Sequence, residues 1–303
     1  MKTPLLDAIR DRPLLGDGAM GTQLMIAGLE QGLCGEAWNL THRDRVLEIQ
    51  RRYADAGSDC IITNTFGGSR IMLNRHGNAD SVRDINVAAV EIARRAFGDR
   101  EGFVLGDMGP FGGLMEPYGD FTEDEVRAAF LEQARALVDG GADAIIIETQ
   151  TGLEELGLAI DAARDAGAPC IIGSLAYDVT LDGSTFRTMM GVDPERAAEF
   201  MEEKGADIVA LNCGTGMDMV WARQAVERYK GATGLPVMAQ PNAGLPRLVN
   251  MKVVYDETPD EMVRGVVPLL DAGVSIIGGC CGSTPEHIRA FRSAMDQYLG
   301  QQP

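Results

Sequence analysis

The stretch EDEVRAAFLEQARALVDGGADAIIIETQ, residues 123–150, contains the unit from which the whole chain is built. Its first part, Glu123 to Asp139, carries apolar residues at helical spacing, and a pair of glycines ends the predicted helix. The apolar run from Ala144 to Glu148 follows at once and predicts a buried strand. A helix joined through glycine to an apolar strand is typical of a parallel sheet with crossover helices.

The same unit recurs along the 303 residues. Between the apolar runs, helices are predicted over stretches such as Arg43 to Ala56, Ser81 to Ala96 and Asp193 to Glu203. Eight units suffice to close a barrel, so we predict an α/β protein with one (β/α)8 TIM barrel over residues 1–303. An open doubly wound sheet is the alternative architecture. The eight predicted strands are Leu14 to Leu15, Cys60 to Thr63, Phe103 to Gly106, Ala144 to Glu148, Cys170 to Gly173, Ile208 to Leu211, Val237 to Gln240 and Ser275 to Gly278.

Charge and hydropathy exclude two classes of partner. Acidic residues number 45 against 27 basic ones, a formal net charge of -18, and no basic stripe stands out. Nucleic acid and anionic membranes are therefore poor partners. The amino terminus, MKTPLLDAIRDRPLL, interrupts its apolar residues with charges, unlike a signal peptide. No later stretch reaches the ~18 apolar residues of a membrane helix, so we predict a cytoplasmic protein.

Polar residues follow the predicted strands. In a barrel of this kind the chemistry is built at the carboxyl ends of the strands. Any one of these residues could instead form a turn or cap a helix, but as a set on one rim they favour a site. They are Asp17, Asn64, Asp107, Glu148, Ser174, Asn212 with Cys213, Gln240 with Asn242, and Cys280 with Cys281.

Three cysteines give the sharpest prediction. NCG at residues 212–214 and GGCCG at residues 278–282 follow the sixth and eighth strands, so their thiols can converge. Three protein ligands with a vacant fourth position are the arrangement of a catalytic zinc ion. Alternatively, Cys213 is a small core residue and Cys280 and Cys281 are core residues or a strained vicinal disulfide. Packing gives no reason for two cysteines between glycines, which favours zinc.

The remaining cysteines and one long loop receive other predictions. Cys60 and Cys170 lie inside apolar strands and are predicted to be core residues, whereas Cys34 is predicted to be a loop thiol. The glycine-rich GPFGGLMEPYGD at residues 109–120, which contains Tyr118, either closes over a ligand or is an ordinary exposed loop.

Five motifs carry a family resemblance. GDGAMGTQL at 16–24, TNTFGGSR at 63–70, LNCG at 211–214, PNAG at 241–244 and GGCCGSTPEHI at 278–288 resemble the homocysteine S-methyltransferase family, in the family's order. The resemblance covers nearly the whole chain. It implies a zinc-dependent enzyme that methylates the sulfur of homocysteine to give methionine.

The resemblance also implies roles for particular residues. Cys213, Cys280 and Cys281 become the zinc ligands. Asp17 and Glu148 are expected near the substrate ammonium, which needs carboxylates. Backbone amides of Gly18 and Ala19 are expected near its carboxylate, and Asn212 is grouped with these substrate-binding residues.

The methyl donor is left open by the motifs. Within the family, the segment around TNTFGGSR looks more like the homocysteine module of cobalamin-dependent methionine synthase than like S-methylmethionine enzymes. The chain ends before any corrinoid-binding domain, so we expect a separate methylated corrinoid protein as donor, docked on the rim. The alternatives are a self-sufficient enzyme with a sulfonium or betaine donor, a demethylase passing methyl groups to a corrinoid protein, and a non-catalytic zinc-binding scaffold.

Zinc has a chemical purpose in this prediction. The thiol of homocysteine resembles that of cysteine, with a pKa of about 8.5, and only the thiolate attacks well. A zinc ion favours the deprotonated form, so no separate general base is required.

Overall fold

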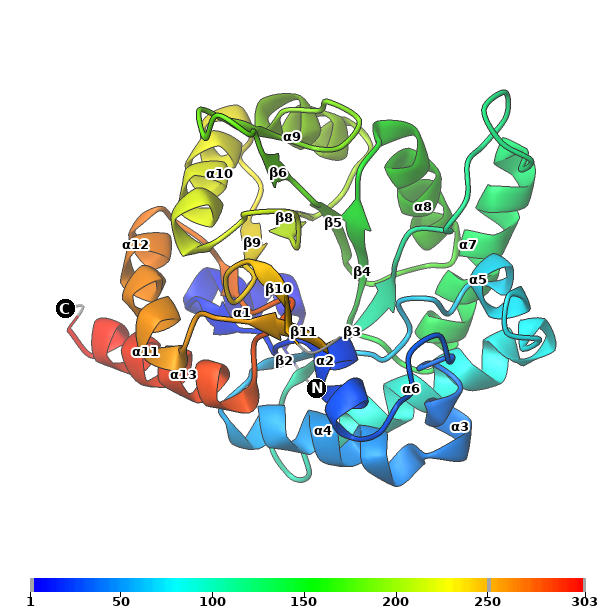
Figure 1. The fold of residues 1–303 in the computed structure, drawn as a ribbon, viewed down its shortest axis with the longest axis horizontal. Helices are drawn as coiled ribbons and strands as arrows, with labels where there is room; N and C mark the ends of the chain where they lie inside the picture. Colours follow the sequence, from blue (N-terminus) through cyan, green and yellow to red (C-terminus); the bar gives the residue numbers. More distant parts are fainter. Residues whose placement is uncertain (1–2, 250–251, 302–303) are drawn as a thin grey trace.

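The computed structural model describes residues 3–249 and 252–301. Eight strands form one sheet in which every paired neighbour is parallel. Viewed along the barrel, the strands form an inner ring with helices around them (Figure 1). In their order around the sheet they are β1 (Leu14–Leu15), β12 (Ile276–Ile277), β9 (Val237–Gln240), β8 (Ile208–Asn212), β5 (Ile171–Leu175), β4 (Ala144–Gln150), β3 (Phe103–Met108) and β2 (Cys60–Ile62).

Two hydrogen bonds bridge the ends of this order, where β1 and β2 meet. The Asp59 amide donates to the Leu15 carbonyl at 2.7 Å, and the Ile62 amide donates to the Asp17 carboxylate at 2.9 Å. The sheet therefore curls into the predicted (β/α)8 barrel, and the open doubly wound alternative is wrong. All eight predicted strands are present, with ends that differ by at most two residues.

Helices cover the outside of the barrel. The predicted helix Glu123 to Asp139 has those bounds in the structure, and Thr122 begins it by accepting a hydrogen bond from the Glu125 amide at 3.3 Å. The helices are α1 (Leu5–Asp11), α2 (Met20–Ile26), α3 (Trp38–Thr41), α4 (Arg43–Asp55), α5 (Arg70–Asn74), α6 (Val82–Ala96), α7 (Glu123–Asp139), α8 (Leu153–Asp165), α9 (Pro194–Glu203), α10 (Met219–Ala232), α11 (Pro259–Met262), α12 (Val266–Asp271) and α13 (Pro285–Leu299), with 3-10 turns at Ala79–Ser81 and Val263–Gly265.

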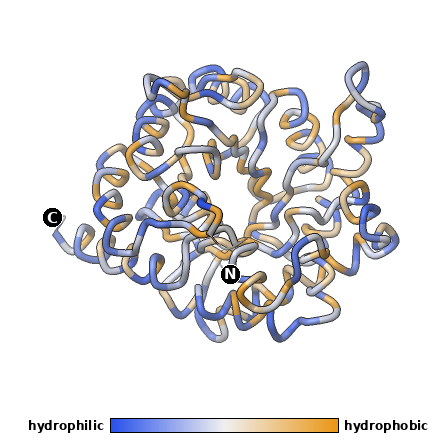
Figure 2. Tube along the Cα trace, viewed as in Figure 1, coloured by the Kyte–Doolittle hydropathy of each residue, from blue (hydrophilic) through white to orange (hydrophobic). Residues whose placement is uncertain are grey.

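The apolar core has two main parts, and a small cluster of Leu73, Val82 and Ile85 lies apart from them. One lies between strands and helices, where Figure 2 shows hydrophobic residues toward the inside and hydrophilic residues toward the periphery. The other fills the barrel interior, and helix α1 adds Leu5 and Ile9 to it at the amino-terminal end. Cys60 and Cys170 belong to this interior core, which confirms their prediction.

Two antiparallel hairpins interrupt the repeat on the carboxyl-terminal side of the barrel. One pairs β6 (Asp178–Val179) with β7 (Phe186–Arg187), and the other pairs β10 (Pro246–Val249) with β11 (Lys252–Tyr255). Within the described part of the chain, no helix combines the length and the apolar character that crossing a membrane requires.

Candidate active site

The top layer of the barrel interior is polar. Side chains alternate along a strand, so residues two positions beyond the interior core again point inward. On β3, for example, Leu105 belongs to the interior core and Asp107 lines the cavity above it. The polar side chains of this layer are Asp107, Glu148, Ser174, Asn212 and Gln240.

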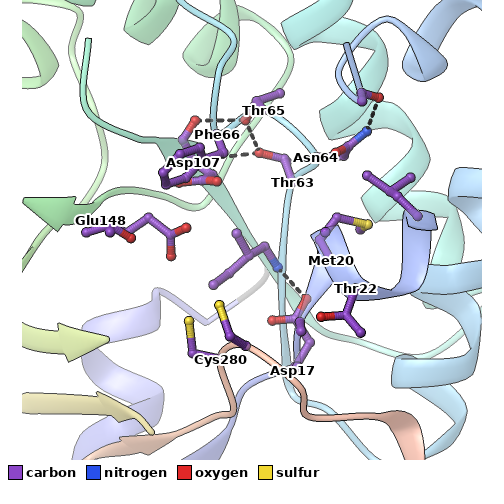
Figure 3. Close-up of a pocket in the computed structure, with 18 of the residues that line it drawn as sticks. Asp17, Met20, Thr22, Thr63, Asn64, Thr65, Phe66, Asp107, Glu148 and Cys280 are labelled. Carbon is purple, nitrogen blue, oxygen red and sulfur yellow. Dashed lines mark hydrogen bonds between the residues drawn. The ribbon is translucent and has the colours of Figure 1, made fainter. Parts of the chain in front are cut away.

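A cavity of about 390 Å³ opens above this layer. Residues from seven of the eight predicted strand ends line it, and Figure 3 shows Asp17, Glu148 and Cys280 facing the same space. Among the described residues, no lysine, arginine or histidine lines it. The predicted rim residues in its wall are Asp17, Asn64, Asp107, Glu148, Cys213, Gln240, Cys280 and Cys281.

The three predicted metal-binding thiols converge in the cavity wall. The Sγ atoms of Cys213, Cys280 and Cys281 all lie within 4.8 Å of one another, and those of Cys213 and Cys281 are 3.8 Å apart. Two thiolates on a tetrahedral zinc ion, each at about 2.3 Å, are separated by about 3.8 Å. All three cysteines are free, so the vicinal disulfide is not formed. The trio therefore fits a zinc ion in both chemistry and spacing.

Backbone geometry and one asparagine bring the two cysteine loops together. Cys213 has φ +57° and Gly214 has φ +87°, so the chain turns sharply after β8. Asn242 donates to the Gly214 carbonyl at 2.8 Å and accepts from the Cys281 amide at 3.1 Å. This side chain links the loop after β8 to the loop after β12.

The cluster itself favours a thiolate. Hydrogen bonds from Cys213 and Cys280, with a further one from Tyr255, lower the pKa of Cys281 to about 3 against the effect of burial. Hydrogen bonds with Cys213 and Cys281, together with burial, raise the pKa of Cys280 well above its ordinary value. The cluster therefore favours the deprotonated form at Cys281.

Two carboxylates face the thiols, the buried Asp17 and the partly buried Glu148. Asp17 is 2% exposed, its Oδ2 accepts from the Ile62 amide, and its Oδ1 has no partner in the described structure. Burial raises its pKa well above the ordinary range. Burial and the nearby charge of Cys281 raise the pKa of Glu148 to about 7. Both acids gain from a cationic ligand, since desolvation penalises an unpaired carboxylate.

The turn after β1 lies against the cysteine loop. The Ala19 amide donates to Ser283 Oγ at 3.1 Å, and this hydroxyl donates to the Cys280 carbonyl at 2.7 Å. A Cβ at Gly18 would come within 2.8 Å of both Ser283 Oγ and Tyr53 Cε1. Glycine at this position therefore permits the close approach of the two segments.

Asn212 lies behind the cavity wall. Its Oδ1 accepts from the Thr149 amide at 2.8 Å and from Ser174 Oγ at 2.7 Å, while its Nδ2 donates to Thr149 Oγ1 at 2.8 Å. Thr149 has φ +59°, an uncommon conformation for a β-branched residue. Asn212 thus holds a strained residue next to Glu148.

Sequence reasoning missed some residues of the site. Glu36 and Phe66 line the cavity, and the Glu36 carboxylate accepts from the Gly67 amide at 2.7 Å. Tyr255 reaches Cys281 from the β10–β11 hairpin. Phe66 lies within the TNTFGGSR motif, but no pattern marks Glu36 or Tyr255, because tertiary packing alone brings them here.

The loop at residues 109–120 stays outside the cavity, and Tyr118 is 86% exposed. Its first part is tied down by Glu155, in the first turn of α8, whose carboxylate accepts from the Phe111 amide at 2.7 Å. Burial raises the pKa of Glu155 to about 7.

Glu155→Gln is expected to flatten the pH dependence of stability. The folded chain holds the Glu155 proton more tightly than the unfolded chain, so this carboxyl lowers the free energy of unfolding as pH rises from about 4.5 to 7. Glutamine keeps the acceptor without the charge. In urea unfolding, the free energy of unfolding of the variant minus that of the wild type should be about 2 kcal/mol larger at pH 8.5 than at pH 5.5. Glu154→Gln, on an exposed neighbour, is the control, and an equal difference at both pH values would contradict the assignment.

Comparison with known proteins confirms the family resemblance. The sequence profile described as Homocysteine S-methyltransferase matches residues 14–295. The chain is 37% identical to methionine synthase of Mycobacterium tuberculosis over 308 residues and 35% identical to that of Mycobacterium leprae over 305. Each alignment covers 97% of this chain but 25% of the relative, so the chain spans about a quarter of their length.

Solved structures share the fold. The homocysteine methyltransferase MmuM from Escherichia coli, in its metallated form, superposes with a TM-score of 0.77 at 20% identity, over 95% of this chain and 99% of that one. Pyruvate carboxylase from Rhizobium etli gives a TM-score of 0.54 at 15% identity, over 96% of this chain and 28% of that one. These similarities show the barrel, whereas the profile and the sequence relatives show the family. The chain is an enzyme that belongs to the homocysteine S-methyltransferase family.

Proposed function

We propose that this barrel transfers a methyl group to the sulfur of homocysteine, giving methionine, with zinc held by Cys213, Cys280 and Cys281. One observation carries the proposal: three free thiols within 4.8 Å of one another share a cavity with the buried Asp17 and the partly buried Glu148. The thiols suit a soft metal ion, and the acids suit an ammonium group. Homocysteine offers both a sulfur and an ammonium, four bonds apart.

Different residues of the chain would bind the thiol, the ammonium and the carboxylate of homocysteine. When bound, zinc supplies positive charge that favours the deprotonated form of the substrate thiol at neutral pH. Asp17 and Glu148 accept hydrogen bonds from the substrate ammonium. The Gly18 amide makes no hydrogen bond within the described residues and is available to the substrate carboxylate, whereas Ala19 must first leave Ser283. Asn212 acts by positioning, since it fixes Thr149 beside Glu148.

The donor we propose is a methylated corrinoid protein. Similarity to two methionine synthases supports this choice. A protein donor also needs a docking surface, and loops at the carboxyl-terminal side expose large apolar side chains. These are Leu114, Tyr118, Leu181, Met189, Met190 and Leu248. A docked partner would exclude water and align the methyl group with the attacking sulfur.

The test combines metal content, substrate binding and turnover. We expect one zinc per chain, a new sulfur ligand in the zinc X-ray absorption spectrum when homocysteine is added, and methionine when methylcobalamin is supplied. S-methylmethionine and betaine are offered in parallel. Turnover with either small donor, and none with methylcobalamin, would replace the proposed donor while keeping the site. If zinc is bound but homocysteine adds no sulfur ligand to it, the proposed function is wrong.

A further inference from the structure

Asp107 is a buried acid in the cavity wall that the proposed binding of zinc and substrate does not use. It lies on β3, is 3% exposed and lines the cavity. Its backbone is satisfied, since the amide donates to Thr63 Oγ1 at 2.9 Å and the carbonyl accepts from Thr65 Oγ1 at 2.8 Å. The carboxylate differs, because Oδ1 has no partner among the described residues. Figure 3 shows it beside Glu148, in the same open space.

The carboxylate of Asp143, an acid with a structural role, makes the hydrogen bonds that Asp107 lacks. Asp143, in the loop before β4, accepts from the Val104 amide and from the Arg94 guanidinium, each at 2.7 Å. Asp107 has no such bonds, and its neighbours Glu148, Glu36 and Asp17 are also acids. Burying an unpaired carboxyl among like charges destabilises the empty protein. A ligand that brings donors and positive charge would reverse this effect.

Resting on the proposed function, we infer that Asp107 is a third acceptor for the substrate ammonium and makes the site selective for a primary amine. An –NH3+ group has three N–H donors. Of the four carboxylates in the cavity wall, Glu36 already accepts from the Gly67 amide. The other three are Asp17 and Asp107, each with an unpaired buried oxygen, and Glu148. No basic side chain lines the wall to compete for them. A substrate lacking the amine would leave these acceptors unpaired and be rejected.

Asp107→Asn separates this role from a structural one. Binding to the zinc-loaded chain is measured by calorimetry with homocysteine and with 4-mercaptobutanoate, which has the same chain and no ammonium. The variant should bind homocysteine about 10- to 100-fold more weakly and 4-mercaptobutanoate at least as tightly as the wild type. Zinc content should stay at one per chain. The melting temperature of the substrate-free protein should rise, because a buried carboxyl with an unpaired oxygen and acidic neighbours is removed.

Asp143→Asn is the matched control, because it changes an acid that is already paired at the other end of the barrel. It should lower the melting temperature and leave both affinities unchanged. An unchanged homocysteine affinity in Asp107→Asn, or an equal loss for both thiols, would overturn the inference alone. A wild-type chain that binds zinc but not homocysteine would overturn the proposed function together with it.

Discussion

Replacing Cys281 with alanine is expected to remove zinc from the purified chain and, with it, methyl transfer. Cys281 is the sulfur whose pKa the cluster lowers, through hydrogen bonds from Cys213 and Cys280. Its loss leaves two ligands where a catalytic zinc site uses three. Loss of an outer-shell contact already weakens metal binding about 10- to 100-fold, so loss of a ligand should exceed that range. Zinc content after dialysis, and competition with a chromogenic chelator, measure the effect.

Cys34→Ala is the control for that experiment. Cys34 is a partly buried thiol whose Sγ lies 3.4 Å from Glu36 Oε2, and it does not belong to the cluster of three. This variant should keep one zinc per chain and full turnover. If Cys281→Ala also kept its zinc and its activity, the three thiols would not be the metal site, and the proposed mechanism would fail with them.

The sequence was sufficient to predict the barrel because each unit repeats the same local signals. Strand Ala144–Gln150 was predicted as Ala144 to Glu148, and its two extra residues lie beyond the apolar run that made it visible. The same limit applies to Phe103–Met108, which was predicted to end at Gly106 and continues through Asp107 and Met108. Polar inward residues end the apolar pattern before these two strands end, so both were predicted too short, whereas β2 and β12 are shorter than predicted.

The cysteine trio was predictable for a different reason. Its members lie in two short motifs at strand ends, and a closed barrel brings all carboxyl ends to one face. The remaining site residues carry no such mark. The pattern listed Asp107 and Asn212 as rim residues, but only their contacts show that Asn212 is fully engaged whereas Asp107 Oδ1 is unpaired. Glu36 and Tyr255 enter the site from segments without a motif.

Several features of the site therefore destabilise the folded chain when no ligand is bound. Unpaired acids, a threonine at φ +59° and a cysteine at φ +57° each raise the free energy of the folded chain. Neighbouring contacts such as those of Asn212 and Asn242 hold these features in place. Binding of zinc and an ammonium substrate offsets part of this strain, so ligands should stabilise the chain by more than simple occupancy of an indifferent cavity.

Gly214→Ala is expected to produce the largest structural effect of any single methyl group in the site. A Cβ at Gly214 would lie 1.8 Å from the Tyr177 carbonyl oxygen, and the tyrosine is fixed, with its hydroxyl 2.7 Å from that of Tyr229. Gly216→Ala is the control, because it has a similar φ of +79° but only Val179 nearby, at 3.2 Å. Backbone strain should lower the free energy of unfolding of this control by about 1–2 kcal/mol.

In Gly214→Ala, the same backbone strain should lower the free energy of unfolding, and overpacking should lower it further, by about 3 kcal/mol or more. The displaced backbone also carries Cys213, so zinc affinity should fall in this variant and not in Gly216→Ala. Urea unfolding with a chelator present gives the stability of each chain, and metal content is measured separately. Equal destabilisation in the two variants, with zinc retained by both, would mean that the turn after β8 can relax. The conformation at Cys213 would then not depend on the close approach of Gly214 to Tyr177.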